Sequence, residues 1–367
     1  RGLFFTEFNL PEVSTFLVLF TAPHLMLGLG LLLLCAAFYV RCWRRPSRLG
    51  VIGSGLCTLG LGLINSFSLP TLCVVIAAHY VFMCWQTRRL AWWPLASGVV
   101  VFFIAAPFLA YSLLVFGMDP FWGVVYGQQN VLPTPPLPYL ALGLGPVFFL
   151  TAVGLPRYLR QPTATEWLVV IWVVVSIALM YAPVVFQRRL GFGLQPVLCV
   201  VAAVGLEVTW RWIWSRGGRG RSLDRAVLTA CLLASLFASN LLLYVSLLRS
   251  AAYPGGQLAV WLYQPVAVAE GAQWLAGQMG PDDVVLAEPV TANYLAGVVP
   301  GRVFLGHWSA TLDFEGKAAA MRQLYCGDDD NAKRSFLTTN RIRYVWYGPK
   351  ERALGCVPLS DPDVREA

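Results

Sequence analysis

The chain is dominated by eight apolar runs of about 17–25 residues, long enough to cross the hydrocarbon core of a bilayer as helices. Helices satisfy their own backbone hydrogen bonds, which lipid cannot do for them. Mean hydropathy is +0.62 and only 13% of residues are charged, which excludes an ordinary soluble domain of this length. The sequence predicts an α-helical polytopic membrane protein with about eight transmembrane helices, at 16–40, 49–66, 69–85, 91–114, 138–156, 167–185, 190–208 and 226–248.

Charge is distributed unevenly along the chain. Residues 1–250 carry 17 arginines, no lysine and six carboxylates, whereas residues 251–367 carry ten basic and 13 acidic side chains. With the amino end outside, 13 of the first 17 arginines fall in cytoplasmic segments, as the positive-inside rule requires. The basic charge therefore indicates topology, and we expect no nucleic-acid partner. A multi-pass location in the cell membrane follows, and four arginines are left outside: Arg1, Arg188, Arg189 and Arg249.

Three regions are expected: an external loop segment at 1–15, a transmembrane helical domain at 16–250, and an extracytoplasmic domain at 251–367. The last region alternates short β-type runs with amphipathic helical runs, which predicts a small α/β domain with a largely parallel sheet. Cys326 and Cys356 both lie in it and could pair in an oxidising compartment, but the sequence does not set their geometry.

The chain begins Arg1-Gly2-Leu3, without an initiator methionine or a signal peptide. Its first apolar run follows a short polar and aromatic stretch typical of a loop interior. We therefore expect the sequence to be the C-terminal part of a longer protein.

One cluster of polar residues lies between the predicted sixth and seventh helices, where Pro183 is expected to bend or end the sixth helix. An arginine fork binds phosphate oxygens through two parallel hydrogen bonds, so Arg188 and Arg189 near the headgroup plane indicate a lipid-linked phosphate. The alternative is that both arginines reach ordinary lipid phosphates. The residues predicted to bind here are Tyr181, Gln187, Arg188 and Arg189.

A second cluster precedes or begins the first span and contains Glu7, Glu12 and His24. An imidazole and a carboxylate at the external interface could hold a divalent metal, for which His24 and Glu7 are candidates, or a phosphate. The alternative is that His24, about two turns inside a bent helix, bonds a backbone group freed by Pro23. His79 is interpreted as a neutral residue hydrogen-bonded to a neighbouring helix.

A third cluster follows the predicted strands of the C-terminal domain, where α/β domains bind ligands. It could form a surface for sugar or for docking, or it could be a structural loop. Its members are Glu288, Asn293, His307, Trp308, Ser309 and Asp313.

Three short motifs extend over nearly the whole chain: Pro11-Glu12…Thr15-Phe16…Pro23-His24, Tyr181-x-Pro183…Gln187-Arg188-Arg189…Pro196, and Gly306-His307-Trp308…Asp313-Phe314…Lys317. In these the chain resembles the C-terminal two-thirds of bacterial integral-membrane glycosyltransferases of the GT-C superfamily, in particular the polyprenyl-phosphate-sugar-dependent, mannosyltransferase-like group. The resemblance implies transfer of a hexose from a polyprenyl-phosphate carrier to a glycan, lipid or protein acceptor at the external membrane face. Glu12 and His24 would line the cavity, and Arg188 and Arg189 would hold the carrier phosphate.

The sequence departs from that family in one respect. Such enzymes carry a catalytic acidic residue in the first external loop, and no acidic pair occupies a matching place here. The catalytic base is therefore expected upstream of Arg1, and the portion in hand is expected to be inactive alone.

Two hypotheses from other classes stay open. One is a transporter or flippase for an anionic lipid or solute, although the spans show no evident internal repeat and few intramembrane carboxylates of the kind that proton coupling usually needs. A membrane anchor that presents the C-terminal domain would leave the external arginines unexplained.

Overall fold

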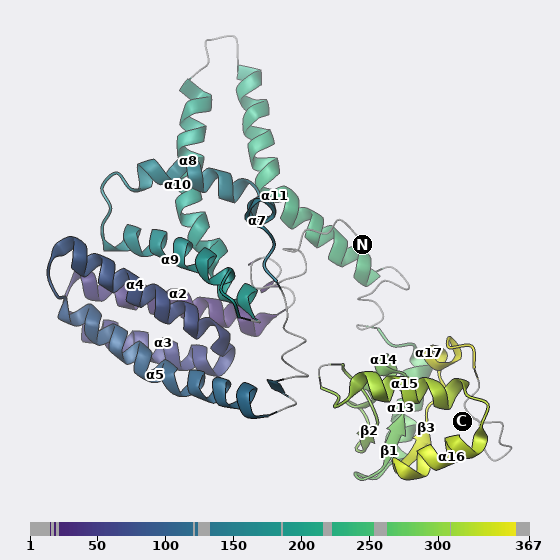
Figure 1. The fold of residues 1–367 in the computed structure, drawn as a ribbon. Coiled ribbons are helices and arrows are strands. Elements are labelled where there is room, and N and C mark those ends of the chain that lie inside the picture. Colours follow the sequence, from purple (N-terminus) through teal and green to yellow (C-terminus); the bar gives the residue numbers. More distant parts are fainter. Residues whose placement is uncertain are drawn as a thin grey trace. The chain divides into compact units, whose positions relative to one another are not determined.

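The structure is a computed structural model, and it divides into two compact units, Arg1–Tyr244 and Val245–Ala367, which are described separately below (Figure 1). The structure describes residues 15, 18–19, 22–119, 122–123, 133–184, 186–215, 222–252, 263–308 and 310–356.

The first unit is built from helices. Their order is α2 (Pro23–Arg44), α3 (Arg48–Asn65), η3 (Ser66–Ser68), α4 (Leu69–Thr87), α5 (Trp92–Met118), α7 (Leu137–Leu144), α8 (Pro146–Tyr158), α9 (Ala164–Met180), η5 (Gln187–Gly191), α10 (Leu194–Ser215) and α11 (Ser222–Ala252), the last of which crosses the boundary between the units.

Each of the eight predicted spans overlaps one of these helices or a pair of them, but the count of eight is not confirmed. By length and apolar composition, the described residues contain four membrane-crossing helical stretches, or up to six if each of two bent pairs is one span. Helix α9, an apolar helix of 17 residues, is shorter than these four stretches and is not counted among them. The chain is thus a helical membrane protein with at least four such stretches: 23–44, 48–87, 92–118 and 187–215.

The predicted span 138–156 is divided into two helices. Helices α7 and α8 meet at an angle of 94° at Gly145, whose φ is +58°, and Pro146 begins α8. A positive φ is easily adopted by glycine, and proline is favoured in a first turn. At about 1.5 Å per residue, the 13 residues of α8 reach only about 20 Å, less than the roughly 30 Å of a hydrocarbon core. The apolar pattern did not reveal this bend.

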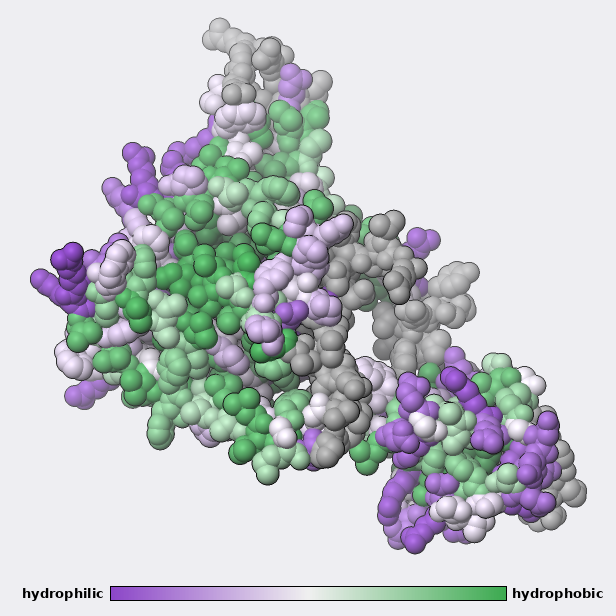
Figure 2. All heavy atoms as spheres, viewed as in Figure 1, coloured by the Kyte–Doolittle hydropathy of each residue, from purple (hydrophilic) through white to green (hydrophobic). Residues whose placement is uncertain are grey.

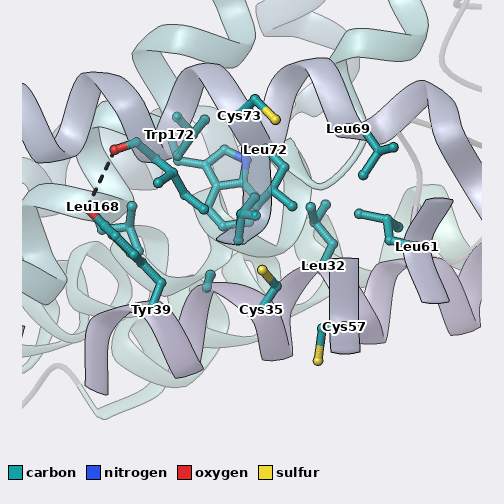
Figure 3. Packing of buried hydrophobic residues seen from close by; sticks show 14 of the residues in the cluster. Leu32, Cys35, Tyr39, Cys57, Leu61, Leu69, Leu72, Cys73, Leu168 and Trp172 are labelled. Atoms are coloured by element: carbon teal, nitrogen blue, oxygen red, sulfur yellow. Dashed lines mark hydrogen bonds between the residues drawn. The ribbon is translucent and has the colours of Figure 1, made fainter. Parts of the chain in front are cut away.

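Helices α2, α3, α4, α5 and α9 enclose one buried core (Figure 3). Its labelled members include Leu32 and Tyr39 of α2, Leu61 of α3, Leu72 of α4 and Trp172 of α9. The same chain leaves many large apolar side chains on its outside, and green hydrophobic atoms cover much of the helical unit in Figure 2. Such an exterior suits hydrocarbon and would be costly in water.

Helices α8 and α10 approach each other very closely at two glycines. A Cβ atom added at Gly205 would lie 1.8 Å from the carbonyl oxygen of Leu150, and one added at Gly154 would lie 2.5 Å from the nitrogen of Gly205. Small residues at a membrane helix interface permit this approach of backbones. This contact fixes the position of α10 against α8, and α10 begins just after η5.

The second unit is the α/β domain that the sequence predicts. Three parallel strands are ordered β2 (Arg302–Val303), β1 (Val284–Leu286) and β3 (Ile342–Val345). Val284 pairs with Arg302 on one side and Ile342 on the other. The helices are α13 (Val266–Gln278), α14 (Pro289–Leu295), α15 (Phe314–Cys326), α16 (Asp330–Thr339) and α17 (Pro349–Arg352).

Both faces of this sheet are covered. Val285 and Ala287 pack in a core with Leu275 of α13 and Leu295 of α14, whereas Leu286 packs in a second core with residues of α15. Successive residues of a strand point to opposite faces, so the unbroken apolar run 284–287 supplies both cores. The domain surface carries many hydrophilic atoms, shown in purple in Figure 2.

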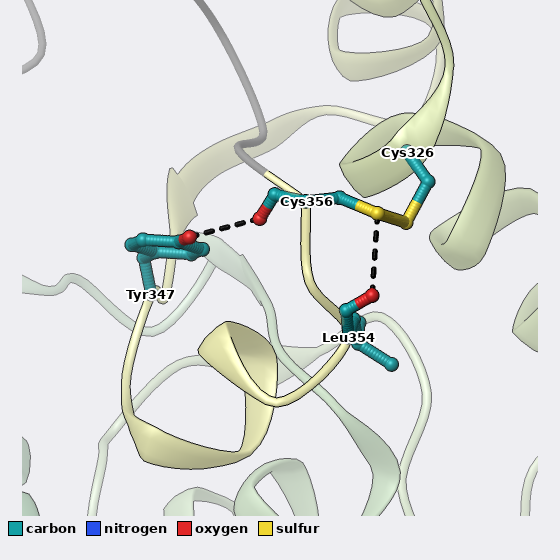
Figure 4. Close-up of a disulfide and its surroundings, with 4 residues drawn as sticks. All are labelled: Cys326, Tyr347, Leu354 and Cys356. Carbon is teal, nitrogen blue, oxygen red and sulfur yellow. Dashed lines mark hydrogen bonds between the residues drawn. A yellow bond between two sulfur atoms is a disulfide. The ribbon is translucent and has the colours of Figure 1, made fainter.

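A disulfide joins Cys326, at the end of α15, to Cys356, with 5.0 Å between their Cα atoms (Figure 4). Tyr347 donates a hydrogen bond from its hydroxyl to the carbonyl oxygen of Cys356 at 2.8 Å. The pairing that the sequence left open is therefore present.

Candidate functional site

The predicted phosphate-binding residues lie in a segment that we call the arginine turn, residues 181–193, between α9 and α10. The sequence predicts that the sixth span ends at residue 185 and that the seventh begins at residue 190. In the structure α9 ends at Met180 and α10 begins at Leu194. Pro183 follows the end of α9 closely, as prolines that cannot continue a helix often do. Gly193, with φ +87°, leads into α10. The connection is therefore longer than predicted and contains its own 3₁₀ helix, η5.

The two arginines have different surroundings. Arg188 is buried, with only 5% of its surface exposed, and Arg189 is half-buried. The guanidinium carbon of Arg189 lies 4.6 Å from the centre of the Phe67 ring, and that ring lies 5.6 Å from the Phe186 ring. An aromatic face stabilises a cation by cation–π attraction, more strongly where water is excluded. Phe67 of η3, which sequence reasoning did not single out, thus contacts Arg189 just before α4 begins.

Gln187 fixes the turn through its side-chain amide. With the amide oriented so that both of its atoms are satisfied, its nitrogen donates to the carbonyl oxygen of Ala182 at 2.8 Å and its oxygen accepts from the backbone N–H of Thr134 at 3.0 Å. Thr134 also donates from its hydroxyl to the carbonyl oxygen of Met180. These bonds connect the arginine turn to the proline-rich segment 133–136.

Tyr181 strengthens the same connection, because its hydroxyl donates to the carbonyl oxygen of Pro135 at 2.7 Å. On the other side of the turn, the Thr71 hydroxyl of α4 donates to the carbonyl oxygen of Leu190 at 2.9 Å, in a buried position. The polar groups of Tyr181 and Gln187 thus position the arginines. Direct ligand binding by these two residues stays a prediction.

The cluster around the first span is described only in part, because Glu7 and Glu12 lie outside the described residues. His24 is exposed and stands in the first turn of α2, not two turns inside a helix as the sequence predicts. The reason is Pro23, which takes the first helical position, where a missing N–H costs nothing. The proposed roles of Glu12, His24 and Glu7 in binding phosphate or metal stay predictions.

Two contacts place Thr15 and the first turns of α2 at the end of the helical unit that carries the arginine turn. The backbone N–H of Thr15 donates to the side-chain oxygen of Gln195, in the first turn of α10, at 2.6 Å. Gly28, one turn after His24, packs against Asn65, which directly precedes η3. In the part of the chain that the structure describes, no three His, Cys, Asp or Glu side chains come together as metal ligands.

His79 is bonded as the sequence predicts. Its Nε2 lies 2.8 Å from the carbonyl oxygen of Ala164, which can only accept, so Nε2 carries the proton. Its Nδ1 then accepts from the Tyr39 hydroxyl at 3.0 Å. A neutral imidazole satisfied on both nitrogens joins α2, α4 and α9, and it has a structural role.

Two described members of the polar cluster of the C-terminal domain are helix caps. The Glu288 carboxylate accepts from the backbone N–H of Val290 at 2.8 Å and caps α14, and Asp313 caps α15. His307 lies against the half-exposed Trp308 ring, with 5.5 Å between ring centres. Ser309 lies outside the described residues. The interpretation as a structural loop accounts for the two carboxylates.

Sequence reasoning missed Glu351, a fully buried carboxylate in the described part of this domain. Its two oxygens accept from the backbone N–H groups of Glu288 at 2.8 Å and Gly348 at 3.0 Å, so it joins the segments that follow β1 and β3. Burial raises the pKa of the Glu351 carboxyl above its usual range, although these hydrogen bonds act in the opposite direction. The sequence Pro349-Lys350-Glu351-Arg352 resembles a solvated turn and gave no signal of this burial.

Comparison with known proteins adds no family to this description: no protein-family model matches the chain, and no curated protein matches it.

Proposed function

We propose that this chain forms part of a membrane-embedded transferase that acts on lipid-linked phosphate. More specifically, we propose a glycosyltransferase that moves a hexose from a polyprenyl-phosphate carrier to an acceptor at the external membrane face. The observation that carries the proposal is the arginine turn, in which two adjacent guanidinium groups are held in an apolar helical unit by η5.

The chemistry of the turn favours phosphate as the ligand. A guanidinium is planar and always charged, and it can donate two parallel hydrogen bonds to phosphate oxygens. Phe67 stabilises the charge of Arg189 through the face of its ring. The hydrogen bonds of Tyr181 and Gln187 fix the backbone before the arginines, and the bond from Thr71 to Leu190 fixes it after them, so little conformational freedom is lost when a ligand binds.

In the proposed reaction the bond between the anomeric carbon of the sugar and the carrier phosphate oxygen breaks, and its electron pair goes to the phosphate. Arg188 and Arg189 stabilise the charge that develops there, as preorganised cations do for a leaving group. The acceptor oxygen forms the new bond to the anomeric carbon and loses its proton to a base.

Two observations support an external location for the C-terminal domain. The Cys326–Cys356 disulfide is a feature of proteins in oxidising compartments. The distribution of arginines in the first 250 residues assigns the end of the last predicted span to the same side.

The test is sugar transfer from a polyprenyl-phosphate donor by the full-length protein and its Arg189→Ala variant. We expect turnover to fall about 100-fold or more, because one preorganised donor group is typically worth that much. Arg189→Lys keeps the positive charge but loses the planar guanidinium that donates two parallel hydrogen bonds. It should therefore retain only part of the native turnover. Arg157→Ala removes an exposed arginine from the predicted cytoplasmic side and should leave turnover unchanged.

Unchanged turnover and unchanged donor affinity in Arg189→Ala would refute the phosphate role. Accumulation of the lipid or solute in proteoliposomes, with no covalent product, would show transport in place of transfer.

A further inference from the structure

An apolar groove with a volume of about 660 Å³ lies on the outer face of the helical unit. It is lined by one face of α4, between Val74 and Trp85, and by Phe102 of α5, and all of its lining residues are apolar. From Val74 to Trp85 the helix rises about 17 Å, at roughly 1.5 Å per residue. This is close to half of a hydrocarbon core of roughly 30 Å, which is the depth of one leaflet. The groove therefore fits the acyl chain of an ordinary membrane lipid.

The Trp85 end of the groove lies at the opposite end of α4 from the arginine turn. Helix α4 ends at Thr87, and Arg88 and Arg89 follow it, one turn after Trp85. Trp85 is 75% exposed, and Trp92, in the first turn of α5, is 71% exposed. Tryptophans exposed at the end of a membrane helix are typical of the boundary between hydrocarbon and headgroups. Arg88 and Arg89, which are both exposed, thus stand at headgroup level beside the groove.

A third arginine is held at the same end of the helical unit. The Phe82 ring, which lines the groove, packs with 4.6 Å between ring centres against the Trp167 ring of α9. Thr165, two residues before Trp167, accepts a hydrogen bond from the Arg44 guanidinium at 3.0 Å. The ends of α2 and α4 therefore both lie close to the start of α9.

This end of the helical unit is strongly basic, and the connections that follow α4 and α8 lie on the same side of it (Figure 1). Segments 41–48, 88–89 and 157–166 contain eight arginines, no lysine and one carboxylate, Glu166. Among the described residues, none of these arginines forms an ion pair with a carboxylate. Arginine binds phosphate oxygens through two parallel hydrogen bonds, and basic sites on the cytoplasmic side of membrane proteins bind anionic headgroups. The excess of positive charge favours an anionic headgroup over a zwitterionic one, whose own cation would be repelled.

We propose that the groove and the arginines at its Trp85 end form a binding site for an anionic phospholipid of the cytoplasmic leaflet. One acyl chain lies along α4 from Trp85 toward Val74, and the phosphate group contacts Arg88 and Arg89, while Arg44 adds a third positive charge. Only a lipid fits both parts of this site, because the groove faces hydrocarbon and the arginines stand at headgroup level. The site is independent of the proposed transferase function, because it shares no residue with the arginine turn.

The test is a titration of the purified full-length protein in detergent with two phospholipids that carry the same oleoyl chains, phosphatidylglycerol and phosphatidylcholine. Native mass spectrometry measures the affinity of the first bound lipid. We expect the anionic lipid to bind about 30-fold more tightly, because two arginines near a headgroup phosphate contribute about that factor. In Arg88→Gln/Arg89→Gln this preference should fall to within about threefold. Val81→Trp, at an exposed position of the groove, should weaken both lipids about tenfold, equivalent to losing contact with about two methylene groups.

Arg157→Gln/Arg160→Gln is the matched control, because it removes the same charge from the end of α8 and the residues after it, which do not line the groove. It should keep the preference for the anionic lipid. If this control loses as much of the preference as Arg88→Gln/Arg89→Gln, diffuse positive charge attracts the lipid and the proposed site does not exist. Equal affinity of the native protein for the two lipids, or unchanged affinities in Val81→Trp, would also overturn the inference.

Discussion

Gly205→Ala should destabilise the helical unit by forcing α8 and α10 apart. A Cβ atom at position 205 would lie 1.8 Å from the carbonyl oxygen of Leu150 and 3.0 Å from the backbone nitrogen of Gly154. Real Cβ atoms essentially never approach another heavy atom closer than 3.0 Å. The two helices would therefore have to separate by more than about 1 Å here, and neither obstructing atom can rotate away because both belong to the backbone.

The expected cost follows from this geometry. Overpacking in a close-packed interior typically costs about 1–3 kcal/mol, and a rigid backbone obstacle puts Gly205→Ala near the upper limit. For a unit of this size, 1 kcal/mol corresponds to about 2–4 °C in Tm, so a decrease of roughly 6–12 °C is expected. Gly30→Ala is the matched control, because a Cβ atom at Gly30 in α2 meets nothing within 4 Å. It should be neutral or slightly stabilising, since alanine favours a helix over glycine by about 0.5–1 kcal/mol.

The assay heats the purified full-length variants in detergent and measures the fraction that stays monodisperse in size-exclusion chromatography. If the Tm of Gly205→Ala is no more than about 2 °C below the Tm of Gly30→Ala, the close approach of α8 and α10 does not stabilise the unit, and the reasoning is wrong. Donor binding measured below the transition should fall in Gly205→Ala, because α10 begins directly after the arginine turn.

Three further outcomes are expected. Phe67→Leu should weaken donor binding about 5–30-fold, because the half-buried Arg189 loses a cation–π contact worth roughly 1–2 kcal/mol. Glu351→Gln should destabilise the C-terminal domain by about 1–3 kcal/mol, because the amide nitrogen cannot accept from a backbone N–H. Since burial raises the pKa of Glu351, the native domain should lose stability as the pH rises from about 4.3 through that raised pKa, and the variant should lack this dependence. Cys356→Ser should cost roughly 3–4 kcal/mol, from opening a covalent loop with a sequence separation of 30 to Cys326.

Each of these outcomes has a direct check. Phe67→Tyr keeps an aromatic face and should retain donor affinity, so an equal loss in Phe67→Leu and Phe67→Tyr would contradict the cation–π argument. Urea unfolding followed by tryptophan fluorescence between pH 4 and pH 8 reports on the Glu351 prediction, which fails if native protein and variant show the same pH slope. For Cys356→Ser, addition of a reductant to the native protein should reproduce the loss, and should change the variant little.

The sequence predicted best those features that follow from a single rule of burial or hydrogen bonding. In the C-terminal domain, alternating β-type and amphipathic helical runs predicted an α/β domain with a largely parallel sheet, and the observed sheet is parallel. Its central strand lies in the apolar run 284–287, as a sheet buried on both faces requires. His79 was interpreted correctly for a similar reason, since an imidazole inside apolar helices must satisfy both nitrogens.

Features that depend on contacts distant in sequence escaped prediction. Hydropathy does not distinguish a straight span from two helices that meet at 94° at Gly145. Arg188 and Arg189 were found by their charge, whereas Phe67 and Thr134 lie more than 50 residues away and carry no unusual signal of their own. The burial of Glu351 depends on two backbone N–H groups, one of them 63 residues earlier, which no local pattern encodes.

The hydrogen bond from His79 to Ala164 has a consequence for how the chain is made. The two residues are 85 positions apart, so at about 5–20 residues per second the ribosome needs roughly 4–17 s to produce the acceptor after the donor. Tyr39 is synthesised first, and it can engage only one of the two imidazole nitrogens. During that interval the Nε2–H group of His79 in α4 does not yet have its acceptor, the carbonyl oxygen of Ala164 in α9. The bond between His79 and Ala164 can therefore form only after α9 has been synthesised and packs against α2 and α4.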